Sequence, residues 1–390
     1  MFQLYVLALF FFTANSILTV IFPLQAADYG FREGEIGIMM GMYMFVCMGL
    51  RPWAGQLIAK YSVLTIMKWL LVGHALALLL YVWLGVESLY IVRALQGVVT
   101  AFFSMAMQIG IASILLDKDR GQGMSMYSLS TVLPGLYGPA LALLLWTHFD
   151  HLYLLLLIAA LSVLPFLFVF RSPLPATRED KGMFTFREMY TAFKTTRRHR
   201  GLMVSALVML IGASVFGAIT TFLPLYMITT GYGNAALYLF LQAIVVVVSR
   251  FLLRKIVPSD GKWHPSFMSI VLVSSVIGTT LLAFMPYIGH FIYVSAIFNG
   301  LATAMLYPTI ITYMSFAIPQ ESKHILLGVF LASYDLGFAL GGFVMGFVIQ
   351  MSSFSIMFII CAIVGLAAIM FIWANRKEAD VFVIDKGAVS

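Results

Sequence analysis

The sequence predicts an all-α membrane protein with twelve transmembrane helices arranged as two related six-helix halves. Of the 390 residues, 62% are hydrophobic and only 10% are charged, whereas an ordinary soluble domain has about 45–50% apolar and about 25% charged residues. The apolar residues fall in runs of about 20, which is the length an α-helix needs to cross a bilayer. Motifs in the first half of the chain also recur in the second. This composition excludes a soluble enzyme, a disulfide-linked secreted scaffold, a disordered chain and a coiled coil.

Each apolar run is expected to be a helix, because a backbone inside lipid must satisfy its own hydrogen bonds. Strands of a membrane barrel would be about ten residues long and would alternate in polarity. The predicted spans are residues 3–26, 34–58, 64–84, 88–115, 122–147, 151–170, 201–228, 234–256, 265–285, 289–317, 325–349 and 354–374.

The basic residues predict how the chain is oriented in the membrane. If both termini are cytoplasmic, 18 of the 23 Lys and Arg residues fall in the inner loops, at the inner end of the eighth span or in the tail, as the positive-inside rule requires. We therefore expect a multi-pass protein of the cell (cytoplasmic) membrane, surrounded by lipids, with both termini inside. This placement accounts for the net charge of +7, so nucleic acid is not expected as a partner.

The predicted spans and the one long loop between them give the domain organisation. We predict a six-helix bundle over 1–170, a cytoplasmic linker over 171–200, a second bundle over 201–374 and a cytoplasmic tail over 375–390. The linker carries eight basic and three acidic residues, and its apolar residues recur at helical spacing. It is therefore expected to contain an amphipathic helix on the inner membrane surface.

Six matches in the same order, at offsets of 199 to 203 residues, relate the two halves. Phe22-Pro23-Leu24 corresponds to Leu223-Pro224-Leu225, and Gln96-Gly97 corresponds to Asn299-Gly300. Internal repeats of this kind are typical of secondary transporters, whose substrate site lies near the middle of the membrane between the halves. The sequence has no Gly-x-x-x-x-Gly-Lys-Ser/Thr loop for ATP. An ion or substrate gradient is therefore expected to drive transport.

Charged side chains inside the predicted spans are few, and they are candidates for function because they are costly in lipid. Arg93, in the fourth span, has donors that suit carboxylates. Asp335, in the eleventh span, can serve as a proton carrier or can bond a neighbouring helix. His74, in the third span, is expected to pack. A cavity with one cation and neutral polar groups favours an anionic or zwitterionic solute.

Polar residues of the spans complete the candidate site. The predicted substrate-binding residues are Arg93, Asn15, Thr19, Gln96, Thr100, Thr220, Gln242 and Asn299. Each of the amides and hydroxyls can equally make bonds between helices. The two cysteines lie inside apolar runs and are expected to be small buried hydrophobes. No metal site, cofactor or enzymatic motif is expected.

Three motifs resemble signatures of the major facilitator superfamily, along nearly the whole chain. Gly55-Gln56-Leu57-Ile58-Ala59-Lys60 resembles the loop between helices 2 and 3, although Ala59 stands where an aspartate is usual. Arg93-Ala94-Leu95-Gln96-Gly97 matches the helix 4 signature. The helix 5 antiporter signature is resembled by Pro134-Gly135-Leu136-Tyr137-Gly138-Pro139.

This resemblance implies the major facilitator fold and proton-coupled export, with Arg93 tied to coupling. It also implies gating roles for Gly55, Pro134, Gly138 and Pro139. Arg51-Pro52-Trp53-Ala54-Gly55 further resembles the opine-type metallophore exporters. We therefore predict a secondary active exporter of a small anionic or zwitterionic solute, working as a proton antiporter and expected to be monomeric. The alternatives are a polyspecific multidrug/proton antiporter and, from another class, a non-transporting membrane receptor.

Overall fold

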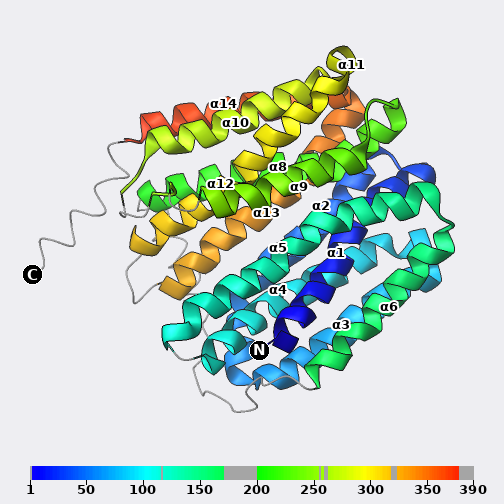
Figure 1. Ribbon diagram of the computed structural model, residues 1–390, viewed down its shortest axis with the longest axis vertical. Coiled ribbons are helices and arrows are strands. Elements are labelled where there is room, and N and C mark those ends of the chain that lie inside the picture. The colour runs from blue at the N-terminus through cyan, green and yellow to red at the C-terminus, as the bar shows by residue number, and fades with distance from the viewer. Residues whose placement is uncertain are drawn as a thin grey trace, which may run out of the picture. The chain divides into compact units, whose positions relative to one another are not determined.

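The computed structural model describes residues 2–115, 117–170, 200–253, 256–258, 262–317 and 323–376. Within these ranges the regular secondary structure is helical, and no strand is formed. The chain divides into two compact units: unit 1 is Met1–Phe31 with Ile38–Phe184, and unit 2 is Arg32–Gly37 with Thr185–Ser390 (Figure 1). The predicted amphipathic helix of the linker lies outside the described residues, as does the predicted tail beyond residue 376.

Among the described residues, six long helices belong to the first half of the chain. They are α1 (Phe2–Asp28), α2 (Glu33–Lys60), α3 (Val63–Leu84), α4 (Leu89–Ile114), α5 (Asp117–His148) and α6 (His151–Val169), with a 3₁₀ turn, η1 (Gly85–Ser88), between α3 and α4. Six more long helices and two short turns follow. These are α8 (Arg200–Thr230), α9 (Ala235–Leu252), α10 (Pro265–Ala283), α11 (Met285–Ile288), η2 (Gly289–Phe291), α12 (Ile292–Ala317), α13 (Lys323–Met351) and α14 (Phe354–Ala374).

The predicted fold class is confirmed. Eleven helical stretches of the described chain are long and apolar enough to cross a membrane. One of them, Val63–Ile111, is 49 residues long and contains both α3 and most of α4. Each of the twelve predicted spans therefore corresponds to a long helix.

Three predicted boundaries differ from the helices by three residues or more. α5 begins at Asp117 rather than 122, because its first turn is polar but still helical. α9 ends at Leu252 rather than 256, because the backbone of Leu253, with φ of −93° and ψ of 2°, leaves the helical conformation. α12 begins at Ile292 rather than 289 because Gly289, with φ of +55°, ends α11.

The repeat seen in the sequence recurs in the local geometry of each unit. Gly85 ends α3 with φ of +56°, and Gly289 adopts nearly the same angle at the corresponding connection of unit 2. A residue with a side chain rarely adopts such an angle, so glycine suits both turns. The two units thus use the same turn before the helix that carries the candidate residues.

The helices within each unit pack in corresponding ways. In unit 1, α1 packs against α5 and α6, and α3 packs against α4 and α6. In unit 2, α8 packs against α13, and α10 packs against α12 and α14; Figure 1 shows α10 running beside α14. Each unit has its own apolar core, which includes Phe11 and Phe103 in unit 1 and Phe330 and Ile372 in unit 2.

Candidate functional site

The predicted cation, Arg93, lies inside unit 1 and is 1% exposed. Its Nη2 group donates to the backbone carbonyl of Leu18 on α1, at 3.0 Å. Pro23 in α1 has no N–H to give to the carbonyl of Thr19, the next residue after Leu18, so the hydrogen bonding of α1 is interrupted at this turn. The guanidinium is therefore anchored beside the turn in which α1 lacks one backbone hydrogen bond.

Soft and aromatic groups surround the rest of the guanidinium. Nη2 also donates to Sδ of Met40 on α2, at 3.1 Å. The guanidinium carbon lies 4.7 Å from the ring centroid of Phe22 and 5.7 Å from that of Tyr43, which are distances at which a ring attracts a cation. Nε is buried and has no hydrogen-bond partner in the described structure.

No hydrogen bond or ion pair joins Arg93 to a carboxylate among the residues that the structure describes. A buried cation without an anion costs several kcal/mol, because desolvation is not offset by a counter-charge. The neutral groups around Arg93 compensate that cost only in part. Its surroundings are therefore suited to an anionic group that arrives from elsewhere.

Four of the predicted substrate-binding residues form one hydrogen-bonded network in unit 1. Arg93 Nη1 donates to Oε1 of Gln96, at 3.3 Å, and Nε2 of Gln96 donates to Oδ1 of Asn15 on α1, at 3.1 Å. Nδ2 of Asn15 donates to Oγ1 of Thr100, at 3.3 Å. The hydroxyl of Tyr43 on α2 also donates to Oγ1 of Thr100, at 3.2 Å. The network thus joins α1, α2 and α4 and is buried throughout.

Two other predicted residues do not join this network. The hydroxyl of Thr19 donates to the Asn15 carbonyl in its own helix, at 2.7 Å, and Thr220 donates to the Phe216 carbonyl in the same way, at 2.8 Å. Both bonds follow the pattern in which a helical threonine bonds the carbonyl four residues earlier.

Asn299 in unit 2 belongs to a separate buried cluster. Its Nδ2 donates to the hydroxyl of Tyr238 on α9, at 3.0 Å, and the Tyr238 hydroxyl also pairs with Ser295 Oγ, at 3.1 Å. The Asn299 amide fills the space beside Gly278 on α10, where a Cβ atom would collide with it. Gln242, on α9, is also buried. This cluster bonds α9 to α12 and contains no charge.

Asp335, the predicted proton carrier, is fully buried in α13. Near it in the sequence, Gly337 brings α13 against the backbone of Leu210, and Gly341 does the same at Ser214, both on α8. Asp335 therefore lies on a helix that is closely packed onto its neighbour. His74, expected to pack, is buried in α3 with its ring centroid 4.5 Å from that of Phe11.

All six residues of the helix 5 signature lie in α5. Pro134 and Pro139 are inside the helix and do not end it. The hydroxyl of Ser16 on α1 donates to the Pro134 carbonyl, at 2.9 Å, and Gly138 lies against the same serine. Gly55, the other residue predicted to take part in gating, lies in α2, but its surroundings are outside the described structure.

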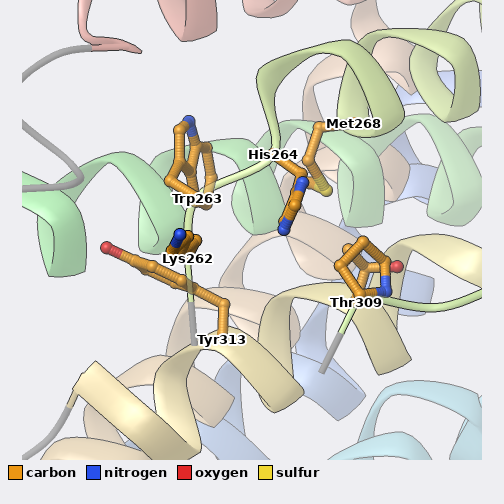
Figure 2. Close-up of a pocket in the computed structure, with 7 residues that line it drawn as sticks. Lys262, Trp263, His264, Met268, Thr309 and Tyr313 are labelled. Atoms are coloured by element: carbon orange, nitrogen blue, oxygen red, sulfur yellow. The ribbon is translucent and has the colours of Figure 1, made fainter. Parts of the chain in front are cut away.

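A small pocket occurs in unit 2 near the start of α10 (Figure 2). It is lined by Pro258, Lys262, Trp263, His264, Met268, Thr309 and Tyr313. The rings of Trp263 and Tyr313 meet edge to face, with centroids 4.9 Å apart. None of the residues predicted for the substrate or the proton lines this pocket.

Comparison with known families identifies the class of protein. The profile of the Major Facilitator Superfamily matches residues 4–266 and 261–383, and the chain belongs to that superfamily. A relative with a described activity is the staphylopine export protein of Staphylococcus aureus strain Mu50. It is 40% identical to this chain over 364 residues, which cover 92% of this chain and 91% of the relative.

Solved structures agree with the fold. The nucleoside transporter NupG matches with a TM-score of 0.75 and 16% identity, covering 96% of this chain and 98% of NupG. The human organic anion transporter MFSD10 (TETRAN) matches with a TM-score of 0.73 and 14% identity, covering 94% of this chain and 97% of that protein. At this identity the likeness concerns the fold.

Some members of the two clusters were not predicted as site residues. In unit 1, Met40 and the Leu18 carbonyl accept hydrogen bonds from Arg93. In unit 2, the Tyr238 hydroxyl is hydrogen-bonded to both Asn299 and Ser295. Spacing along one helix gives no information about which residue of another helix lies opposite. Tyr43, which donates a hydrogen bond to Thr100, is likewise not among the predicted site residues.

Proposed function

We propose that this protein is a secondary active transporter that exports a small anionic or zwitterionic solute from the cytoplasm by alternating access. The substrate class is an opine-type metallophore, for which staphylopine is the test compound. The observation that carries the proposal is the buried Arg93, which is bonded to neutral groups and has no carboxylate partner in the described chain. The 40% identity to a staphylopine export protein supports it.

The charge of the site favours an anion for a physical reason. A guanidinium in a low-dielectric site attracts a carboxylate much more strongly than it would in water. A lipophilic cation would be repelled by the same charge. A metal bound by the metallophore would travel as part of the solute, so the protein itself needs no resident metal.

Proton antiport is the drive that we propose, with Asp335 as the proton carrier and Arg93 taking part in coupling. Asp335 is a fully buried carboxyl group in a membrane helix, and intramembrane carboxyls of this kind commonly carry protons in transporters. In this scheme both termini are cytoplasmic, the protein works as a monomer and lipids surround it.

The test is transport of staphylopine in proteoliposomes. We expect wild-type protein to move staphylopine and Arg93→Gln to reduce the rate at least about tenfold, because the buried positive charge that attracts the carboxylate is lost. Arg32→Gln is the matched control, because Arg32 is an exposed arginine outside the network, and it is expected to keep the wild-type rate.

Two outcomes would contradict the proposal. One is a wild-type rate of staphylopine transport in the Arg93→Gln variant. The other is a wild-type protein that moves a lipophilic cation but not staphylopine, since this is the behaviour expected of a multidrug exporter. A non-transporting receptor would move neither compound.

A further inference from the structure

The hydrogen bonds that begin at Arg93 have a fixed direction, because a guanidinium can only donate. Gln96 must turn its amide oxygen toward Arg93, so its NH₂ group faces Asn15. Asn15 accepts that bond through its own oxygen and therefore turns its NH₂ group toward Thr100. The positive charge thus orients two amides in succession, and the series of donors ends at one hydroxyl.

The Thr100 oxygen accepts two hydrogen bonds, from Asn15 and from Tyr43, at 3.3 and 3.2 Å. A threonine hydroxyl also has one hydrogen of its own to donate. No bond among the described residues uses that hydrogen. Thr100 therefore has a donor to offer to a group from outside the network, and its oxygen is polarised by two donors.

The repeat-related threonine of unit 2 behaves differently. Thr303 follows Thr100 by 203 residues, which is also the offset between Gln96 and Asn299. Its hydroxyl donates to the Asn299 carbonyl of its own helix, at 2.8 Å. That local bond is the usual arrangement for a helical threonine. The hydroxyl hydrogen of Thr303 is therefore used within its own helix, whereas that of Thr100 is not used by any described residue.

We propose that Thr100 is the residue that contacts the exported solute, by donating its hydroxyl hydrogen to a carboxylate oxygen. Arg93 is then a positioning residue, which orients Gln96 and Asn15 and supplies positive charge without touching the solute. This inference rests on the proposed function, because it assigns a contact to the same solute. The inference adds how the solute would be recognised. A carboxylate of the solute accepts a hydrogen bond from the neutral hydroxyl of Thr100, close to the buried positive charge of Arg93.

Staphylopine transport kinetics in proteoliposomes test this assignment. Thr100→Val keeps the shape of the side chain and removes the hydroxyl, and it is expected to raise KM about tenfold with a maximal rate within about twofold of wild type. Thr100→Ser keeps the hydroxyl and is expected to restore KM. Thr303→Val is the matched control and is expected to leave both constants unchanged. Thr100→Ala serves as a second hydroxyl deletion in case the valine variant does not fold.

The outcomes separate this inference from the proposed function. A wild-type KM in the folded Thr100→Val or Thr100→Ala variant would refute the contact and leave staphylopine export standing. An equal rise in KM for Thr303→Val would also refute it, since general loosening of helix packing would explain both changes. No staphylopine transport by the wild-type protein would refute the proposed function and this inference with it.

Discussion

At the scale of single residues, the charge of Arg93 and the hydrogen bonds that it makes can be tested separately. Gln96→Glu places a carboxylate where the Gln96 oxygen now accepts from Arg93, at 3.3 Å. An internal ion pair would neutralise the buried cation, so we expect staphylopine export to fall at least about tenfold. We expect the unfolding temperature not to fall, because an unpaired buried charge gains a partner.

The measurements are proteoliposome flux and thermal unfolding of the purified protein. Gln108→Glu is a suitable control, because Gln108 lies on the same helix but outside the described network. Unchanged export by Gln96→Glu would show that the positive charge of Arg93 is not required. A large fall in unfolding temperature would show instead that the network contributes to stability through its neutral amides.

The sequence is enough to select the residues of this network, but it does not predict which of them contact each other. Arg93 is identifiable because charges are rare in spans, and Thr100 lies on the same helical face. Asn15 was selected as a polar residue of another span. The contacts of Arg93 with the Leu18 carbonyl and Met40 could not be predicted, because they depend on how α1 and α2 are rotated against α4. No periodicity along one helix encodes that rotation.

At the scale of elements, the crossing of α1 and α5 depends on one small residue. A Cβ atom on Gly138 would collide with Ser16, whose hydroxyl bonds the Pro134 carbonyl. We expect Gly138→Ala to destabilise the protein by about 1–3 kcal/mol, because overpacking forces neighbouring helices apart. Thermal unfolding of the purified protein measures this effect, and a slower export rate is expected to accompany it.

Gly135→Ala provides the matched control within the same helix. A Cβ atom at Gly135 meets nothing within 4 Å, and alanine is favoured over glycine in a helix by about 1 kcal/mol. We therefore expect this variant to be as stable as wild type or more stable. If both variants lost stability equally, helix flexibility rather than the α1–α5 contact would be the cause.

Helix positions could be read from hydropathy because lipid imposes both the length and the apolar character of a span. Helix ends could be read less well, because a helix continues beyond the bilayer where its residues allow it. α5 begins at Asp117 within a polar segment, which hydropathy assigns to a loop. The start of α12 depends on the positive φ of Gly289, and an apolar run gives no sign of that angle.

At the scale of the whole molecule, the two units share a backbone pattern but differ in chemistry. A Cβ atom on Gly97 would meet the Tyr43 carbonyl and Val46, and one on Gly300 would meet the Gln242 carbonyl and Val245. These partners are related by the same offset of 199 residues. Arg93, however, corresponds to Ala296, and Asp335 corresponds to Val132, at an offset of 203. Arg93 and Asp335, which are opposite in sign and lie in different halves, therefore have no charged counterpart at the repeat-related position.

This division of charge suggests how transport would be coupled to protons. A unit charge moved through about 100 mV releases about 2.3 kcal/mol, enough for roughly a fifty-fold solute gradient. If Asp335 carries the proton, Asp335→Asn holds the site permanently neutral. We expect this variant to bind staphylopine but to lose the acceleration of export that an imposed pH gradient gives to wild type.

Flux measured with and without a pH gradient, in the same liposomes, tests the role of Asp335. Glu87→Gln is the control, because Glu87 is an exposed acid in η1, and it is expected to respond to the gradient as wild type does. A full response in Asp335→Asn would exclude Asp335 as the carrier. A loss of staphylopine binding together with the response would show instead that the carboxyl maintains the α13–α8 packing around it, because a pure proton carrier can be neutral without losing its solute.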